Sequence, residues 1–433
     1  MHDIINVFWF RRDLRLHDNH GLFEALRAGR PVLPIFIFDT TILDHLEDKK
    51  DARVSFIYEN LQIINKILSA TGRSLLVLVG KPTDIISKLI SSNKIEAIYA
   101  NRDYEPYALK RDLEIYKLLL KKNIEFKTFK DQVIFESEEI LKPDGKPYTV
   151  FTPYSRKWKE AFHLKSPDHF PSENHMFSFL SGIAEIPDLN TIGFSPSEIV
   201  VPEARINHDI LKHYQERRNQ PFPGQTSLTG IHLRFGTISI RQLAMTAGTI
   251  SETYLNELIW REFFMQILVH FPYVTDNNFN RKYDRLIWRN NEAEFDRWCN
   301  GTTGYPLVDA GMRQLNQTGL MHNRVRMVTA GFLTKHLLID WRWGEAYFAK
   351  KLLDFELSSN NGNWQWAAGT GCDAAPYFRI FNPTEQARKF DPQADYVRFW
   401  IQEYEKPGYP DPVVDHAMAR ERAIAAFREA LKS

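Results

Sequence analysis

The sequence predicts an α/β amino-terminal domain with a parallel, doubly wound, Rossmann-like sheet, followed by an all-helical carboxyl-terminal domain. Two observations carry this prediction. Short apolar runs alternate with amphipathic stretches over residues 1–130, and from about residue 206 onward only helical spacing remains. Strands that alternate with helices indicate a parallel sheet covered on both faces. A chain of 433 residues is long enough for two or three such domains.

The elements of the first domain follow in order along the chain. The expected buried strands are Ile4–Phe10, Pro31–Phe38, Ser74–Val79 and Ile95–Ala100. The expected helices between them are His20–Ala28, Asp51–Leu68 and Lys81–Ser91. Ligands of parallel sheets bind beyond the carboxyl ends of the strands, and Arg11–Arg15 lies in that place. Neither a GxGxxG nor a Walker motif is present, so a standard dinucleotide or nucleoside-triphosphate site is not supported.

Residues 131–205 are rich in Pro, Ser and aromatic residues and show little periodicity, which is typical of a long connector. Beyond it, Tyr254–Phe271 and Arg324–Leu338 have the spacing of helices. A further helix over Val308–Leu315 is expected to stop near Gly319. We therefore expect an α/β domain over 1–130, a connector over 131–205 and a helical domain over 206–433.

Composition excludes several classes of protein. The net charge is +1, so contact with nucleic acid would have to come from a local basic patch. Two cysteines, Cys299 and Cys372, cannot form a disulfide framework, and a reducing cytoplasm is expected. The amino terminus lacks a signal-peptide pattern, and no apolar run reaches the ~18 residues of a membrane span. No metal site is expected.

The segment Ser359–Arg379 is the most informative one in the chain. It places Trp364 and Trp366 among small and polar residues, where a hydrophobic core would have Leu, Ile or Val. Amide groups can hydrogen-bond a ligand, glycines allow close approach, and indoles can stack or carry an electron. This chemistry fits a site built around a flat aromatic cofactor.

Two other segments have a functional and a structural interpretation. In Pro223–Gly236, glycines and hydroxyls before a helix fit a phosphate site, but Thr226 or Ser227 would also serve as an ordinary N-cap. Glu257 and Trp260 share a helix face and can together read a flat polar base by hydrogen bonding and stacking. An amphipathic helix with a boundary Trp is the structural alternative.

The same ambiguity holds further along. Met321–Met327 puts Asn323 and Met327 on one helix face, flanked by Arg324 and Arg326, which also fits a basic surface helix. Asp354 and Glu356 can hold a ribityl hydroxyl or pair with an arginine, and can equally form a solvated acidic edge.

Together these segments resemble the photolyase/cryptochrome family along nearly the whole chain. The motifs that carry the resemblance are Trp9–Asn19, Gly304–Leu315, Met321–Arg324, Asp340–Glu345 and Asn360–Arg379. The resemblance implies one non-covalent FAD, folded within the helical domain. By position its contacts are Tyr214, Thr226, Ser227, Leu228, Thr229, Gly230, Arg326, Asp354, Glu356 and Asn360.

Individual roles follow from the same resemblance. Tyr214 and Thr226–Gly230 match the residues that hold the FAD phosphates, and Arg326 matches the ion-pair partner of Asp354. Asn360 stands beside flavin N5, where Asn is the choice of photolyases rather than of cryptochromes. The family's three-Trp electron chain matches Trp364, Trp341 and Trp288.

The resemblance is strongest to photolyases that act on cyclobutane pyrimidine dimers. The lesion-binding residues that it implies are Glu257, Trp260, Asn323, Arg324, Met327 and Trp366, with Glu257 protonated. His322-Asn323 replaces the His-His pair of the related (6-4) enzymes, which disfavours a (6-4) substrate. DNA phosphates are expected to contact Arg218, Arg281, Lys282, Arg285, Arg388 and Lys389.

The function that the resemblance implies is light-driven repair of such dimers in DNA, by electron transfer from reduced FAD to the flipped-out lesion. The alternative is a blue-light-sensing cryptochrome with the same flavin and Trp chain. We expect a monomeric, cytoplasmic, FAD-dependent carbon–carbon lyase. A second, antenna chromophore is implied without an identity, because folate-using relatives have Asn-Glu where this chain has Ala108-Leu109.

Overall fold

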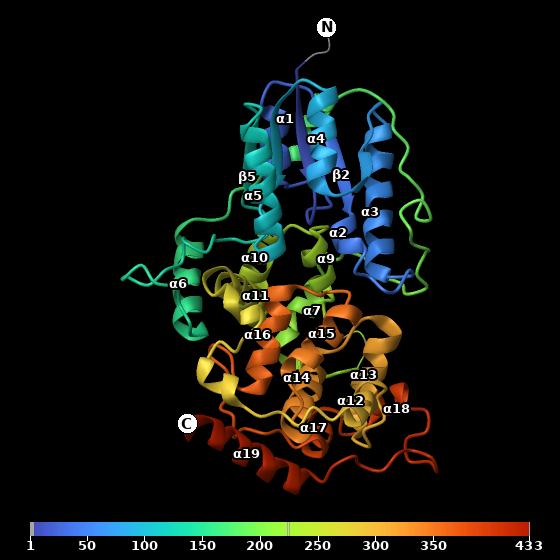
Figure 1. Cartoon of the computed structure of the whole chain (residues 1–433), viewed down its shortest axis with the longest axis vertical. Helices are drawn as coiled ribbons and strands as arrows, with labels where there is room; N and C mark the ends of the chain where they lie inside the picture. The colour runs from blue at the N-terminus through green and yellow to red at the C-terminus, as the bar shows by residue number, and fades with distance from the viewer. Residues whose placement is uncertain (1–3, 223, 225, 433) are drawn as a thin grey trace. The chain divides into compact units, whose positions relative to one another are not determined.

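The computed structural model describes residues 4–222, 224 and 226–432, and the chain divides into two compact units (Figure 1). The first comprises Met1–Glu139, Lys159–Ile206 and Leu228–Thr246. The second comprises Ile140–Trp158, Asn207–Ser227 and Ala247–Ser433. Within the described residues, no helix combines the length and the apolarity that crossing a membrane requires.

A five-stranded parallel sheet forms the centre of the first unit. Its strands are β1 (Ile5–Phe10), β2 (Val32–Asp39), β3 (Leu76–Gly80), β4 (Ile95–Asn101) and β5 (Glu125–Phe129), in the order β3-β2-β1-β4-β5. The central strand β1 is buried along its whole length. Four strands are those that the apolar runs predict. The fifth, β5, escapes that pattern because it lies at the sheet edge and mixes polar and half-buried residues.

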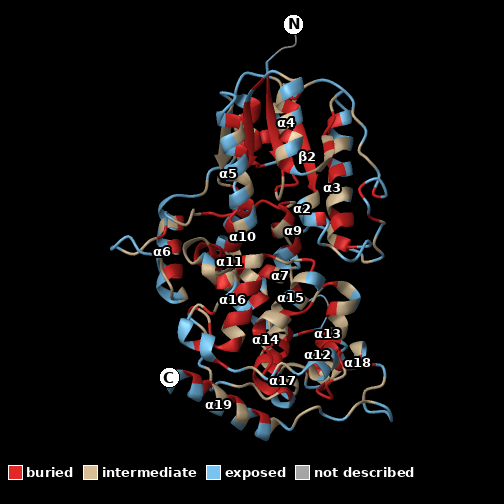
Figure 2. Cartoon of the chain, in the orientation of Figure 1, coloured by how far each residue is buried: buried red, intermediate tan, exposed pale blue. Residues whose placement is uncertain are grey.

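In the part of the chain that the structure describes, the first unit also contains seven helices that belong to it entirely. They are α1 (His20–Arg27), α2 (Thr40–Leu43), α3 (Ala52–Ser69), α4 (Pro82–Ser92), α5 (Pro106–Leu120), the 3-10 helix η1 (Ser172–Ser178) and α9 (Thr229–Phe235). Two more, α6 (Phe151–Leu164) and α10 (Ile240–Ile250), have their residues divided between the units. Val7, Ile35 and Ile98 of the sheet form one apolar core with Ile86 of α4 and Ile115 of α5. Figure 2 shows this core as buried strands beside helices with exposed outer faces.

Among its described residues, the regular elements of the second unit are all helices, apart from one isolated bridge between Leu141 and Pro147. Its helices are α7 (His208–Lys212), α8 (Tyr214–Arg217), α11 (Glu252–His270), η2 (Pro272–Thr275), η3 (Arg281–Arg285), α12 (Glu292–Cys299), α13 (Pro306–Thr318), α14 (Asn323–Gly331), η4 (Phe332–His336), α15 (Trp341–Lys351), α16 (Leu357–Ala368), α17 (Pro383–Phe390), α18 (Asp395–Trp400) and α19 (His416–Lys432). The expected α/β and all-helical fold classes are therefore both confirmed.

Helix α13 ends as its sequence predicts, whereas α14 does not. Gly319 caps α13 with a φ of 68°, a left-handed conformation that suits glycine. The helix predicted over Arg324–Leu338 instead stops at Gly331, and Phe332–His336 form a π-helix. Apolar spacing alone does not distinguish an α-turn from a π-turn, because both bury one side of the helix.

The Arg11–Arg15 segment after β1 bonds to acids of its own unit. Arg11 pairs with Asp112 at 2.5 Å, and Arg12 pairs with Asp103 at 3.1 Å. Arg15 is buried and pairs with the buried Asp131 at 2.7 Å. These arginines follow the first strand, as expected, and their guanidinium groups hold the first unit together.

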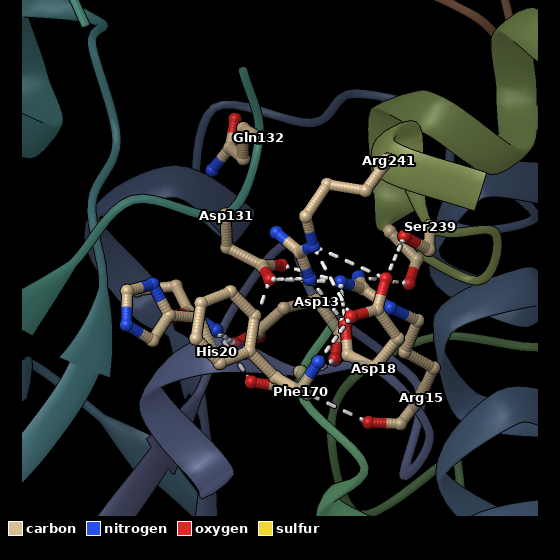
Figure 3. A network of polar contacts seen from close by, with 12 residues as sticks. Asp13, Arg15, Asp18, His20, Asp131, Gln132, Phe170, Ser239 and Arg241 are labelled. Carbon is tan, nitrogen blue, oxygen red and sulfur yellow. Dashed lines mark hydrogen bonds and ion pairs between the residues drawn. The ribbon is translucent and has the colours of Figure 1, made fainter. Parts of the chain in front are cut away.

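A buried polar network continues from Arg15 (Figure 3). Arg241 of α10 reaches Asp131 at 2.9 Å and Asp18 at 3.1 Å, and Asp18 also accepts from the backbone N–H of Phe170 at 2.9 Å. Burial alone would raise the pKa of Asp131, but Arg15 and Arg241 hold it below its ordinary value. Residues remote in sequence thus close around two buried carboxylates.

Candidate functional site

A cavity in the second unit collects many of the predicted site residues. It lies against α14, α15 and α16 and the turn before α16. Its polar lining is Asn323, Arg326, Asp354, Glu356, Ser359, Asn360 and Asn363. Its apolar lining is Met327, Ala330, Phe348, Leu352, Phe355, Trp364, Trp366 and Ala367. Polar groups and indoles that are up to 43 positions apart in the sequence therefore meet at one place.

Helix α16 supplies the largest share of this lining. Asn360 and Trp364 are four residues apart and so lie on one face. Another face of α16 packs closely against α11 at Gly362, where an added Cβ atom would lie 2.1 Å from the ring of Phe264. Gly369, with a φ of 74°, ends the helix. Gly362 thus allows α16 to lie close to α11, and Gly369 ends the helix after Ala368.

The acids at the entrance to α16 are paired. Arg326 binds Asp354 at 2.9 Å, the pair that the resemblance implies. Glu356 is buried and binds Arg261 of α11 at 2.9 Å. Both carboxylates are therefore charge-compensated, and their remaining lone pairs can accept from ligand hydroxyls.

Asn360 is held by α15. Its Nδ2 donates to Glu345 Oε1 at 2.8 Å and to the Glu345 carbonyl at 3.1 Å. Burial raises the pKa of Glu345, and the hydrogen bond from Asn360 opposes that rise. The amide is consequently fixed in orientation.

The other predicted lesion residues lie outside this lining. Glu257, on α11, forms an ion pair with Arg218 at 2.7 Å. Burial raises the pKa of Glu257, while Arg218 lowers it. The ion pair places a charged carboxylate in the free protein, so the protonated Glu257 that the resemblance implies stays a prediction. Arg324 donates to Asn219 Oδ1 at 2.6 Å and lies 4.3 Å from the Phe390 ring.

Trp260 has an aromatic partner that the sequence analysis missed. The Phe151 ring, at the start of α6, stacks on the indole with centroids 3.7 Å apart and planes at 5°. The backbone N–H of Phe151 donates to Asp373 Oδ2 at 3.0 Å. No local pattern links Phe151 to Trp260, because 109 positions separate them. Trp260 keeps intermediate exposure, so solvent reaches it away from the Phe151 face.

His322 was not among the predicted site residues, although it precedes Asn323 in a recognised motif. It caps α14, where its Nδ1 accepts from the backbone N–H of Arg324 at 3.1 Å. Among the described residues its buried Nε2 finds no partner. Burial, with Arg326, Arg324 and Arg218 nearby, lowers the pKa of His322 to about 4. The imidazole is therefore neutral at pH 7, with Nε2–H as a donor available to a ligand.

The predicted phosphate segment falls on both sides of the division between the units. Tyr214 is buried against Tyr254, whose hydroxyl lies 2.9 Å from Ser227 Oγ. Thr226 is half-buried, and Pro223 and Gln225 lie outside the described residues. Leu228, at φ 54°, is the N-cap residue of α9, and Thr229 and Gly230 are the first two residues of the helix. The alternative in which Thr226 or Ser227 caps the helix is wrong, because Leu228 is the N-cap residue.

The three tryptophans of the predicted electron chain lie in one unit but differ in exposure. Trp364 and Trp341 are buried, and Trp341 Nε1 donates to Asn278 Oδ1 at 2.9 Å. Trp288 is partly buried and packs against Phe427 of α19. A fourth residue, Trp298, is fully buried with its ring 6.1 Å from that of Trp364.

The predicted DNA contacts other than Arg218 are exposed. They are Arg281, Lys282 and Arg285 on η3, and Arg388 and Lys389 in the last turn of α17. Arg281 and Arg388 each pair with an acid three positions away, at 2.7 and 2.6 Å. Exposed pairs of this kind are weak and leave the cations available to phosphates.

The donor set of the cavity fits FAD. Paired acids and amides suit a polyol chain and the polar edge of a flavin, and Phe348, Phe355 and Trp364 suit its ring faces. Asp354, Glu356 and Asn360 would hold the cofactor, with Arg326 keeping Asp354 charged.

Two models of known protein families match this chain, one over most of the first unit and one over the helical region that contains the cavity. Residues 6–173 match the family model described as DNA photolyase. Residues 254–407 match the model described as the FAD binding domain of DNA photolyase. The cavity and its polar lining fall inside the second match.

Individual relatives cover nearly the whole chain. The deoxyribodipyrimidine photo-lyase of Halobacterium salinarum is 35% identical over 481 aligned positions, covering 98% of this chain and 99% of the relative. A bacterial class III photolyase from Agrobacterium tumefaciens superposes with a TM-score of 0.87 at 33% identity, over 100% and 99% of the two chains. An archaeal photolyase from Sulfolobus tokodaii, solved with two FAD molecules, gives 0.85 at 34% identity, over 98% and 100%.

Proposed function

Because the chain belongs to the DNA photolyase family, we propose that it repairs cyclobutane pyrimidine dimers in DNA under light, with FAD as its cofactor. The observation that carries this proposal is the cavity in which Asp354, Glu356 and Asn360 meet Trp366 and Met327. Flavin-type and lesion-type residues share one lining there. A flavin and a flipped base bound there would be close enough for electron transfer between them.

The chain's own residues position the reacting groups. Trp260 and Trp366 offer indole faces to a flipped dimer, and Met327 offers a polarizable apolar wall. Asn323, and Glu257 in its neutral form, would donate to pyrimidine carbonyls, where negative charge develops. When bound, reduced FAD supplies the electron that opens the cyclobutane ring and receives it back afterwards. Arg324 would bind a phosphate beside the lesion.

Repair itself is the decisive measurement. Irradiated oligo(dT) is incubated with chemically reduced, FAD-containing protein under blue light, and recovery of absorbance near 260 nm is followed. We expect recovery in the light and none in the dark. A protein with stoichiometric FAD that photoreduces but restores no absorbance would contradict the proposal and favour the cryptochrome alternative.

The second chromophore is tested with the same preparation. After denaturation, the pigments released from the protein show whether a second chromophore accompanies FAD.

The basic residues at the end of α17 should weaken binding without changing selectivity. Changing Arg388 and Lys389 together to Ala is expected to lower affinity for damaged and undamaged DNA alike. The slope of log affinity against log salt should fall by about 2, one for each phosphate contact. Fluorescence anisotropy over a salt titration measures both quantities. A loss confined to damaged DNA would show that these residues read the lesion instead.

Phe151 should act on the lesion through Trp260. Phe151→Ala is expected to reduce affinity for dimer-containing DNA by about 0.5–1.5 kcal/mol, the range for stacked aromatic pairs. Affinity for undamaged DNA should change little, because no phosphate contact is removed. Phe378→Ala, which removes an exposed Phe in the same unit, is the matched control. Equal losses of affinity for damaged and undamaged DNA would show that Phe151 does not act through Trp260.

We further propose that the protein is a monomer of the cytoplasm. Cys299 and Cys372 are buried free thiols, which favours the reducing cytoplasm. The monomer is tested by sedimentation of the FAD-loaded protein across a concentration series. A mass that rises with concentration would contradict it.

A further inference from the structure

The ion pair between Arg218 and Glu257 joins two residues with different predicted tasks. Arg218, at the C-cap of α8, is a predicted contact of DNA phosphate, whereas Glu257, on α11, is a predicted contact of the flipped base. In the free protein they bind each other at 2.7 Å. Their side chains are 29% and 28% exposed, so an approaching ligand can reach both.

The surroundings of this pair are cationic. After burial, the charge of Arg218 contributes to lowering the pKa of both His322 and Arg324. The charge of Arg379 lowers the pKa of Arg324 further. Glu257 also faces the phenol of Tyr214, over whose ring Arg218 lies at 5.5 Å. A phosphate that enters this group is attracted by its arginines and competes with Glu257 for Arg218.

Two other cations on the neighbouring helices are already bound to carboxylates of their own. The neighbour of Glu257 on α11, Arg261, turns to Glu356 at the start of α16. Arg326 of α14 is bound to Asp354. When Arg218 leaves, neither of these cations is free to replace it beside Glu257.

We propose that a DNA phosphate takes Arg218 from Glu257, and that Glu257 takes up one proton from solvent as Arg218 leaves. The carboxylate becomes a carboxylic acid, while Arg218 keeps its charge and is neutralised by the phosphate. The binding of the DNA backbone thereby converts Glu257 from an acceptor into a hydrogen-bond donor. Glu257 reaches the form that a pyrimidine carbonyl needs only when DNA is present.

Physical chemistry gives the exchange its direction. Glu257 lies in a site where burial already favours its neutral form, and Arg218 is the group that opposes this. Removal of Arg218 therefore leaves burial unopposed. The pair itself is partly exposed and so only modestly stable in water, whereas an arginine can bind phosphate through two parallel hydrogen bonds.

Proton uptake on DNA binding tests this proposal. The FAD-loaded full-length protein is titrated with undamaged single-stranded DNA in the dark by calorimetry, in two buffers of different ionisation enthalpy. Between pH 5 and 8 we expect a window in which uptake approaches about one proton per complex, as linkage requires for a single group. The absence of uptake throughout this range would overturn the proposal.

Matched variants assign the proton to Glu257. In Glu257→Gln the uptake should vanish. In Arg218→Met it should also vanish, because Glu257 is then without its cation before DNA arrives. Arg218→Lys keeps the charge and should restore it. Arg388→Ala removes a cation remote in sequence and should leave the uptake per complex unchanged. Uptake that persists in Glu257→Gln would assign the proton to another group and overturn the proposal.

The exchange rests on the proposed function in one respect only, namely that the protonated Glu257 donates to a pyrimidine carbonyl. Its test uses undamaged DNA and no light, so the exchange and dimer repair can fail independently. Repair without proton uptake would remove the exchange and leave the proposed function intact. Uptake without repair would leave an exchange that serves DNA binding alone.

Discussion

Trp364→Phe is expected to remove most of the photoreduction of oxidised flavin while leaving repair by chemically pre-reduced protein nearly intact. Trp364 is buried and lines the cavity beside Asn360, which makes it the tryptophan of the predicted chain that reaches the flavin site. A phenyl ring is much harder to oxidise than an indole, so the electron path would be broken at its first step. Bleaching of flavin absorbance near 450 nm under blue light, with an external thiol, measures the rate.

Trp298 provides the matched control. Its ring lies 6.1 Å from that of Trp364, it is fully buried, and its indole N–H donates to the Thr329 carbonyl at 3.1 Å. It is not part of the predicted chain, so Trp298→Phe should retain photoreduction. If Trp298→Phe blocks photoreduction and Trp341→Phe does not, the predicted path is wrong. A thermal melt of each variant shows whether the substitution has destabilised the fold. This control matters because Gly344 packs directly on the Trp364 ring.

Asp131→Asn is expected to lower the free energy of unfolding by about 3–5 kcal/mol, the range for breaking a buried ion pair from one side. Asp131 is 2% exposed and accepts from both Arg15 and Arg241. The amide would leave two buried guanidinium groups with less compensation. Urea unfolding followed by circular dichroism measures the change. As a control, Glu198→Gln removes a pair with Lys50 in which both side chains are exposed, and it should change stability little.

The same carboxylate predicts a dependence on pH. The pKa of Asp131 is lowered on folding, so its contribution to stability is fully present above the unfolded pKa of about 3.9. That contribution is lost as the pH falls through the folded pKa. Between pH 7 and pH 3 the wild-type protein should therefore lose more stability than Asp131→Asn does. Parallel loss in the two proteins would show that other carboxylates control the acid limit.

The sequence predicted the fold class because apolar runs and helical spacing report burial directly. It gave four of the five strands and the stop of α13 at Gly319. It did not give β5, whose residues are too polar for an apolar run, or the π-turn after Gly331. The strand β5 forms by pairing with β4, whose residues are 28 positions earlier in the sequence. A pattern of adjacent residues carries no information about such distant partners.

The candidate site divides in the same way. Residues within recognisable motifs, such as Asp354, Asn360 and Trp366, were predicted and do line one cavity. Phe151 and Trp298 were missed, since their importance comes only from rings that approach Trp260 and Trp364 in space. The partner of Glu257 was missed for the same reason, although both Arg218 and Glu257 were predicted individually.

The buried network around Asp18 and Asp131 sets an order of events during synthesis. The sheet is complete in sequence at Phe129, but Arg241 leaves the ribosome roughly 110 residues later, which at about 5–20 residues per second is a delay of about 6–22 s. Throughout that interval two buried carboxylates lack one of their cations. The nascent first unit must therefore persist as an incompletely bonded sheet, and agents that slow elongation between these residues would lengthen its exposure to chaperones and proteases.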